Sequence, residues 1–290
     1  MQENMFRFCS FVVFTTLVFL GTAQWGVAGG VAAMRPFLIS AIHFDAELKS
    51  GKMSVLDLAP LAIKYGAQGV EYRDIYWKDK TKELPAVRDQ AARLKLVVTY
   101  TTVTTLYSND TQKQAKLLTD IEDAKALNAP LLRVNLGVRP AAEPEAAGQR
   151  EAARKAIEFA SRSGVKLALE NNSAAPGEQL SDIKATLEEF NSPVLGTNMD
   201  FANYATTGQD PLNAIQALSP WIIYVHAKDA EKTDKGWKTT YLGGGTLPLK
   251  EIFAALEKTG RSFLFCFEFP GAGDPEGGLV KSRAYLAEGK

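Results

Sequence analysis

Short apolar runs alternate with longer segments of mixed polarity along most of the chain. The runs are rich in Val, Ile, Leu and Phe and are bounded by glycine, proline or polar residues, which predicts buried strands. The expected strands cover 37–41, 69–73, 96–103, 131–135, 165–170, 194–200, 221–229 and 263–269. Such runs are typical of strands that are covered on both faces of a sheet.

The segments between these runs show helical spacing. In the first of them Val55, Leu58, Leu61 and Tyr65 recur on one face, and Gly66 is a natural stop. The expected helices cover 54–65, 85–94, 111–127, 141–163, 179–190, 211–218, 249–258 and 276–286. Eight strand–helix units over about 250 residues predict a single-domain (β/α)8 TIM barrel. A doubly wound open sheet is the alternative, weakened because no Gly-rich fingerprint follows an expected strand.

The first part of the chain differs from this pattern. Arg7 precedes an apolar run over 8–20, and small residues follow at 21–23. The run is short for a membrane span, so we expect residues 1–33 to be a signal peptide and leader. The barrel domain then covers 34–290, and the protein is exported, for instance to a periplasm. Translation from Met34 is the alternative and would give a cytoplasmic protein.

Composition limits the class of partner. The 33 basic and 33 acidic residues cancel, and 46% hydrophobic with 23% charged residues is typical of an ordinary globular protein. The chain has no excess of basic residues that would favour binding to nucleic acid. We therefore expect no nucleic-acid partner and no stable membrane insertion after leader cleavage, with self-association into a homo-oligomer as an option. After cleavage only Cys266 remains, which excludes an internal disulfide.

Polar residues at strand ends carry the candidate chemistry, because active sites of such barrels lie at the C-terminal ends of the strands. Four of these ends carry residue types that ligate metals, at Glu170, Asp200, His226 and Glu268. Carboxylates aimed into one barrel mouth repel each other, and a divalent cation is the simplest way to keep them ionised. This donor set suits Mn²⁺, Mg²⁺ or Co²⁺ better than Zn²⁺. Ordinary polar residues satisfied by loop backbone are the alternative interpretation.

One of only two histidines lies in the run over 221–229. Side chains alternate along a strand, so Tyr224, His226 and Lys228 share one face and Asp229 points to the other. We expect His226 to be a neutral ligand among carboxylates. Lys228 is expected either to contact a substrate oxyanion or hydroxyl, or to form a simple ion pair.

The chain resembles the xylose-isomerase-like TIM barrel superfamily, the sugar phosphate isomerase/epimerase group, over roughly 37–286. The resemblance rests on GVEYR at 69–73, LEN at 169–171, DFAN at 200–203, HAKD at 226–229, LGGG at 242–245 and FE at 267–268. It implies that Glu170, Asp200, His226 and Glu268 are the metal ligands. It also implies that Glu170 and Glu268 stand on opposite sides of the reacting carbon as the catalytic pair.

The implied activity is metal-dependent sugar isomerisation or epimerisation, by proton abstraction next to a carbonyl through an enediolate. A lyase or dehydratase of the same family is the alternative, acting like an inosose dehydratase or by β-elimination from a 3-keto-glycoside. A non-catalytic sugar-binding barrel is the second alternative. The sequence departs from ketose 3-epimerases at Asn203, where they carry a histidine, and an amide does not titrate. Endonuclease IV shares the fold, but its metal site needs many histidines and this chain has two. A nuclease is therefore not expected.

The substrate that the resemblance implies is a small-molecule sugar or sugar derivative. Six residues are expected to contact it: Glu71, Lys228, Asn203, Asn172, His43 and Trp237. The alternative for Glu71 is a structural ion pair with Arg73. The alternative for His43 is an ordinary loop histidine with no contact to the substrate. Trp237 offers an apolar ring face to a sugar. Cys266 is expected in the core, because a reactive thiol needs an exposed, electropositive site.

Overall fold

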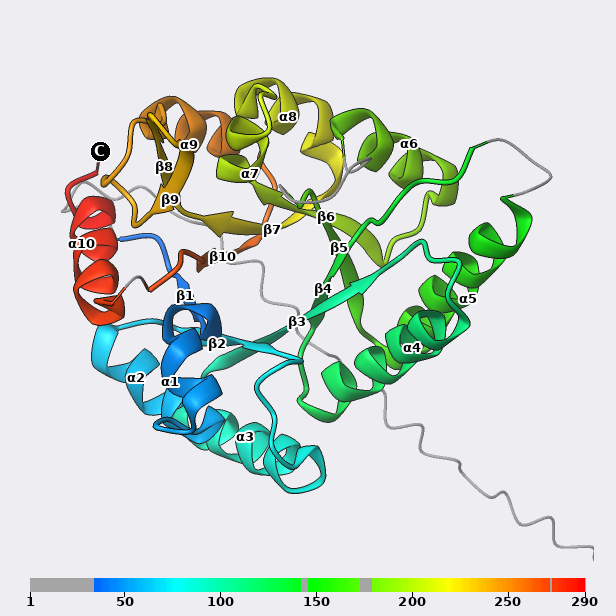
Figure 1. The fold of residues 1–290 in the computed structure, drawn as a ribbon, viewed down its shortest axis with the longest axis horizontal. Coiled ribbons are helices and arrows are strands. Elements are labelled where there is room, and N and C mark those ends of the chain that lie inside the picture. The colour runs from blue at the N-terminus through cyan, green and yellow to red at the C-terminus, as the bar shows by residue number, and fades with distance from the viewer. Residues whose placement is uncertain (1–33, 142–145, 173–178, 272, 290) are drawn as a thin grey trace, which may run out of the picture. The chain divides into compact units, whose positions relative to one another are not determined.

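The computed structural model describes residues 34–141, 146–172, 179–271 and 273–289. Eight parallel strands close into a barrel in the order β1-β10-β7-β6-β5-β4-β3-β2 (Figure 1). They are β1 (Leu38–Ser40), β2 (Gly69–Arg73), β3 (Val97–Thr105), β4 (Leu131–Asn135), β5 (Lys166–Glu170), β6 (Leu195–Asp200), β7 (Ile222–Ala227) and β10 (Leu264–Phe267). The predicted (β/α)8 barrel is confirmed, and the open doubly wound alternative is wrong because β1 pairs with β10.

Helices form the outer ring in Figure 1. The larger ones are α2 (Leu58–Tyr65), α3 (Lys80–Leu94), α4 (Thr111–Ala126), α5 (Ala147–Ser163), α6 (Leu180–Phe190), α8 (Pro211–Leu218), α9 (Leu249–Lys258) and α10 (Pro275–Ala287). Short helices fill the connections: η1 (Ala41–Phe44), α1 (Asp45–Ser50), η2 (Val55–Asp57), α7 (Phe201–Thr206) and η3 (Ser219–Trp221). Gly66 ends α2 in the left-handed conformation, as predicted. Among the helices of the described residues, none has the length and apolar character needed to cross a bilayer.

Helix α3 begins earlier than predicted. The prediction placed its start at Pro85, whereas the helix starts at Lys80. The Asp79 side chain accepts a hydrogen bond from the Lys82 amide, and the Glu83 carboxylate accepts from the amides of Lys78 and Asp79. The first bond satisfies one free amide of the first turn and the other two hold the residues just before it, so the capping residues and not the proline set the boundary.

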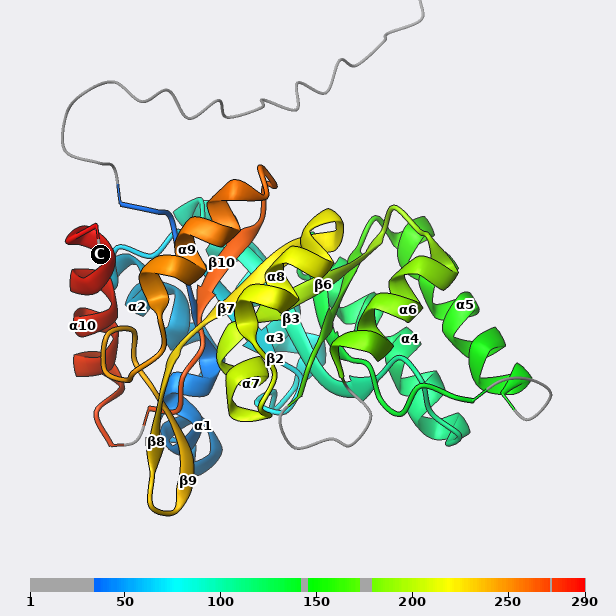
Figure 2. The same cartoon turned by 90° about the horizontal axis from the view of Figure 1, so that it is seen from above.

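The predicted strand over 221–229 also ends earlier, at Ala227. A hairpin of β8 (Asp229–Thr233) and β9 (Gly236–Thr240) follows, which the sequence analysis did not predict. Figure 2 shows this hairpin projecting at the same end of the barrel as α1, which follows β1. That end is the C-terminal face of the strands. The predicted leader over 1–33 lies outside the described residues, and export stays a prediction.

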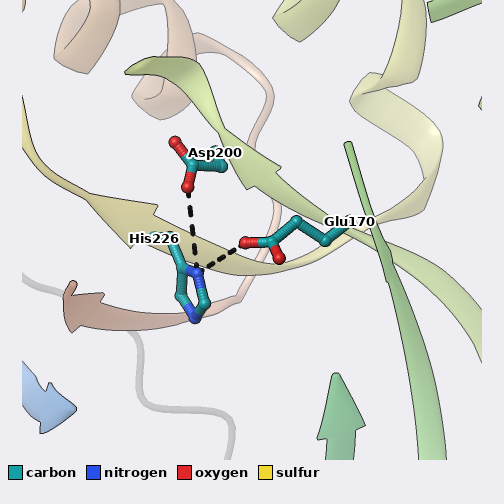
Figure 3. Close-up of side chains that lie close together, drawn as sticks. All are labelled: Glu170, Asp200 and His226. Atoms are coloured by element: carbon teal, nitrogen blue, oxygen red, sulfur yellow. Dashed lines mark hydrogen bonds and ion pairs between the residues drawn. The ribbon is translucent and has the colours of Figure 1, made fainter. Parts of the chain in front are cut away.

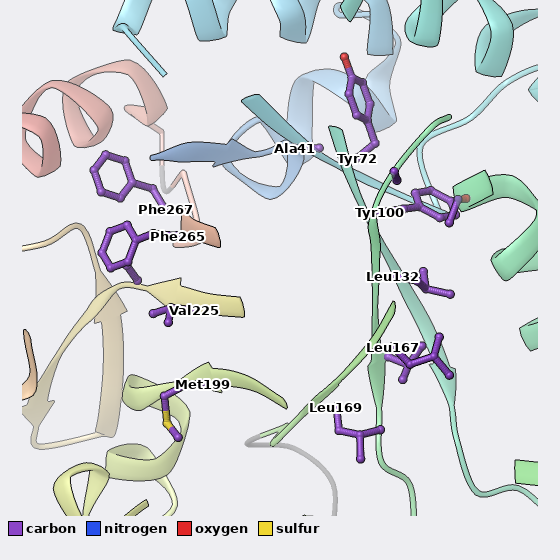
Figure 4. Close-up of a cluster of buried hydrophobic side chains, with 14 of the residues drawn as sticks. Ala41, Tyr72, Tyr100, Leu132, Leu167, Leu169, Met199, Val225, Phe265 and Phe267 are labelled. Atoms are coloured by element: carbon purple, nitrogen blue, oxygen red, sulfur yellow. The ribbon is translucent and has the colours of Figure 1, made fainter. Parts of the chain in front are cut away.

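Alternation along the strands divides the buried residues into an outer and an inner set. The outer set includes Tyr72, Tyr100 and Leu132 and packs between the strands and the helices (Figure 4). The inner set at the N-terminal end of the barrel is a small apolar cluster of Leu38, Leu131, Ala168, Tyr224 and Cys266. Cys266 is fully buried there, as predicted. The next inward positions toward the C-terminal face are polar, and they include Glu71 and His226.

Gly69 offers a direct test of this packing. A Cβ at Gly69 would lie 2.2 Å from the Val97 carbonyl oxygen on the neighbouring strand, whereas one at Gly148 would have no heavy atom within 4 Å. Because sheet backbone has little room to move, we expect Gly69→Ala to lower the free energy of unfolding by about 1–3 kcal/mol. Gly148→Ala, on an exposed helical turn, serves as the matched control and should not lower it. Equal urea unfolding midpoints for the two variants would contradict this packing.

Candidate functional site

His226 lies at the centre of the polar layer, on β7 between two carboxylates. Its Nε2 is 2.7 Å from Glu71 Oε2 and its Nδ1 is 2.8 Å from Glu170 Oε1. Neither the imidazole nor the Glu71 carboxylate is exposed to solvent. The two contacts fix the ring, with Nε2 facing β2 and Nδ1 facing the ends of β5 and β6 (Figure 3).

The four predicted metal ligands come together around His226 Nδ1. Asp200 Oδ2 lies 3.9 Å from Nδ1 and Glu268 Oε2 lies 4.0 Å from it. One ligand atom each from Glu170, Asp200 and His226 fit within 4.8 Å of one another. Strand register explains the convergence, because Asp200 and Cys266 are the Cα partners of His226 and Glu268 lies two residues beyond Cys266.

Three basic side chains neutralise these carboxylates. Lys228 Nζ donates to Asp200 Oδ2 and to Glu268 Oε2, at 2.5 Å each. Lys228 therefore forms the ion pair that was one of its two predicted roles. Two arginines pair with the glutamates: Arg133 Nη2 lies 3.0 Å from Glu170 Oε2, and Arg73 Nη1 lies 3.4 Å from Glu268 Oε1.

The pKa values follow from burial and these ion pairs. Burial raises the pKa of Glu170 and of Glu268, but neighbouring cations outweigh it, and both pKa values lie below the usual range for glutamate. The strongest of these cations are Arg133 for Glu170 and Lys228 for Glu268. The pKa of Asp200 is instead raised to about 6, because burial and the charges of Glu170 and Glu268 outweigh Lys228.

The two flanking carboxylates favour the protonated form of His226. Burial lowers its pKa, but Glu71 and Glu170 more than reverse this and raise the pKa to about 10. The same contact with His226 helps to hold the pKa of Glu71 at about 2 despite burial. With His226 protonated, the cations His226, Lys228, Arg73 and Arg133 equal in number the carboxylates of Glu71, Glu170, Asp200 and Glu268.

Two predicted substrate contacts, Glu71 and His43, are buried and bonded to other groups of the protein. The oxygens of Glu71 accept from Ser40 Oγ at 2.7 Å and from the Tyr224 hydroxyl at 2.9 Å, in addition to His226. This fully buried carboxylate is placed to orient the imidazole rather than to meet a sugar. His43 Nδ1 lies 2.9 Å from the Phe269 carbonyl oxygen, and burial lowers its pKa to about 4, so His43 is neutral.

The other predicted contacts differ in position. Asn203 lies in the first turn of α7, where its amide donates to Asp200 Oδ1 and its Nδ2 donates to the Asn171 carbonyl oxygen at 2.8 Å. Asn172 lines a cavity beside β5. Trp237 lies on β9 of the hairpin and is 39% exposed. Their contacts with a sugar stay predictions.

Two residues that hold Glu170 were not predicted from the sequence. Arg133 pairs with its Oε2, and Asn198 Nδ2 donates to its Oε1 at 3.0 Å. Each lies two positions before a polar strand end, at Asn135 and Asp200. Two-residue alternation along β4 and β6 therefore placed both side chains inside the barrel and was the signal that could have found them.

Known structures of similar fold include sugar epimerases and a dehydratase. D-allulose 3-epimerase from Methylomonas sp., in complex with D-allulose, is 16% identical; the match covers 89% of this chain and 98% of that one, with a TM-score of 0.69. The probable 3-DHS dehydratase involved in petrobactin synthesis from Bacillus anthracis is 18% identical, covering 87% and 98%, with a TM-score of 0.69. A xylose isomerase-like TIM barrel protein from Mycobacterium smegmatis, in complex with magnesium, is 16% identical, covering 87% and 95%, with a TM-score of 0.65.

At these identities the structural matches show a shared fold. A sequence search of curated proteins returned no match. The family described as xylose isomerase-like TIM barrel matches residues 59–289, which is most of the chain and includes all four predicted metal ligands. This protein belongs to the xylose isomerase-like TIM barrel family.

Proposed function

We propose that this protein is a metal-dependent sugar isomerase or epimerase that moves a proton at a carbon next to a carbonyl. The observation that carries the proposal is the convergence of Glu170, Asp200 and Glu268 on Nδ1 of His226. All four side chains lie at the C-terminal end of the barrel, the end where enzymes of this fold place their active sites. The matched epimerase structure has D-allulose bound, which supports a sugar as the substrate class.

The donor set fits a divalent cation. Three carboxylates and one imidazole nitrogen suit Mn²⁺, Mg²⁺ or Co²⁺ better than Zn²⁺, and one structural neighbour contains magnesium. The residues that would hold the ion are Glu170, Asp200, His226 and Glu268. Such an ion polarises the substrate's carbonyl and neighbouring hydroxyl oxygens and so stabilises negative charge that develops when the C–H proton leaves.

The existing charge balance sets two conditions for metal loading. His226 Nδ1 has to lose its proton, while Glu71 keeps its hold on Nε2–H and fixes the tautomer. Lys228 has to release Asp200 and Glu268, because its ammonium group occupies one oxygen of each. Once released, the ammonium lies beside the reacting centre and can donate to a substrate hydroxyl or an enediolate oxygen. This would combine the two roles that the sequence predicted for Lys228.

Glu170 and Glu268 are the proposed proton carriers. Their lowered pKa values keep both ionised at neutral pH, so either can accept a proton. Arg133 and Arg73 each hold one carboxylate from behind, which fixes the direction of its other oxygen. In an epimerisation one glutamate removes the proton and the other returns it on the opposite face.

Isotope exchange tests the proposed reaction. With Mn²⁺ present, incubation with ketoses and with 3-keto-glycosides in D₂O should replace the hydrogen next to the carbonyl with deuterium, without loss of a group. Glu170→Gln and Glu268→Gln should lower the exchange rate at least about 100-fold, since an amide cannot accept that proton. Glu158→Gln, on the exposed face of α5, is the matched control and should exchange like the wild type.

Other outcomes identify the alternatives. Release of an aglycone or formation of an enone would show a lyase, the class to which the neighbouring dehydratase belongs. Sugar binding with no exchange in the wild type would show a non-catalytic barrel. Either result would overturn the isomerase proposal.

Removing Lys228 tests the proposed metal site. Without the ammonium, Asp200 loses the one cation that it contacts closely and Glu268 keeps only the longer pair with Arg73, so a divalent cation can neutralise both. We expect Lys228→Met to lower the Mn²⁺ dissociation constant at least about tenfold in calorimetric titration. Lys232→Met, on the exposed part of β8, is the control and should match the wild type. Unchanged or weaker Mn²⁺ binding by Lys228→Met would contradict the site.

A further inference from the structure

A cavity of about 340 Å³ opens beside the carboxylate site, at the C-terminal ends of β3, β4 and β5. Its walls include Thr105, Asn135 and Asn172, together with Asn109 from the β3–α4 connection and Gln149 from α5. None of the four proposed metal ligands is among the described residues that line it. The cavity is therefore a separate space from the reacting centre, and its volume lies in the range of small-molecule sites.

Direct contacts connect this cavity to Glu170. Asn135 is the Cα partner of Glu170 on the neighbouring strand. Its Oδ1 accepts a hydrogen bond of 2.9 Å from Arg133 Nη1, and the same guanidinium pairs with Glu170 through Nη2. Asn172 lies only two residues beyond Glu170. A molecule that fills the cavity thus lies against the strand ends that carry the proposed base.

The lining suits a sugar ring. The side-chain amides of Asn109 and Gln149 each carry both donors and an acceptor, which is what a ring of hydroxyl groups requires. Val138, which is 65% exposed, supplies apolar surface for the C–H face of such a ring. Among the described lining residues there is no carboxylate, and Lys113 is the one charged side chain. The cavity thus favours a neutral or acidic sugar over a cationic group.

We propose that this cavity is a subsite for a second sugar ring, and that the natural substrate is a glycoside of at least two rings. The reacting ring would lie at Glu170 and Glu268, and its glycosidic neighbour would lie against Asn135 and Asn172. This inference rests on the proposed function, because it names the size and class of the substrate of the same site. It also gives a role to Asn172, which the sequence predicted as a substrate contact.

Ligand binding to the full chain with Mg²⁺ tests the subsite. The affinities of glucose, maltose, cellobiose and trehalose would be compared by saturation-transfer NMR, which also shows which ring contacts the protein. At least one disaccharide should bind about tenfold more tightly than glucose, with both rings in contact. Gln149→Phe, which fills the cavity, should remove that advantage. Asn109→Phe, at an exposed wall position outside the helices, is a second cavity-filling variant and should remove the same advantage.

Ala92→Phe is the matched control. Ala92 lines a different cavity of about 300 Å³, which lies by the first residues of β3 and β4, so this variant should retain the disaccharide advantage. Equal affinity for glucose and every disaccharide, binding of neither, or an advantage that survives both filling variants would overturn the subsite. If isotope exchange on single-ring ketoses persists in that case, the proposed function stands and only the subsite fails. If the subsite binds but no exchange occurs, the proposed reaction fails instead.

Discussion

The contact of His226 with Glu71 and Glu170 is the interaction on which the rest of the site depends. A carboxylate that is buried without a partner costs several kcal/mol, and this barrel buries three of them in one layer, with Glu268 partly buried beside them. The layer is stable only because each carboxylate meets a cation, and His226 serves two of them at once. Its position therefore fixes where Glu170 points, while Lys228 is shared between Asp200 and Glu268.

The same charge balance bears on the proposed metal site. Lys228 and the imidazolium together supply two positive charges at the place where a divalent ion would supply the same number. In the proposed metal-bound state the ion would take over the pairing of Asp200 and Glu268, and the Lys228 ammonium would become available to a substrate. Arg73 and Arg133 pair with Glu268 and Glu170 through the carboxylate oxygens that do not contact Lys228 or His226.

Much of the fold follows from local sequence patterns, because parallel barrel strands need apolar runs and each helix needs an apolar face. Strands β2 and β4 and helix α9 have the predicted bounds for this reason. The hairpin β8–β9 could not be predicted in the same way. Its exposed residues follow a two-residue alternation only weakly, and its base is held by Asp229, whose carboxylate accepts from the distant amides of Gly245 and Leu247.

The part of the candidate site that lies at the strand ends could be predicted from the sequence. Glu170, Asp200, His226 and Glu268 each end an apolar run, so barrel geometry alone brings them near one another. The roles of Glu71 and Arg133 depend instead on register between strands, which brings each beside a partner far away in sequence. Distances between residues on different strands depend on how the closed sheet is paired, and the sequence of a single strand does not determine them.

The most direct test of the account is a crystal structure of the wild-type protein soaked with Mn²⁺, with anomalous scattering measured at the manganese edge. The account predicts one strong peak bound by Glu170, Asp200, His226 and Glu268, with the Lys228 ammonium no longer between the two carboxylates. If no peak appears at these four side chains, and Lys228 still bonds to Asp200 and Glu268 at saturating Mn²⁺, the proposed metal centre is contradicted.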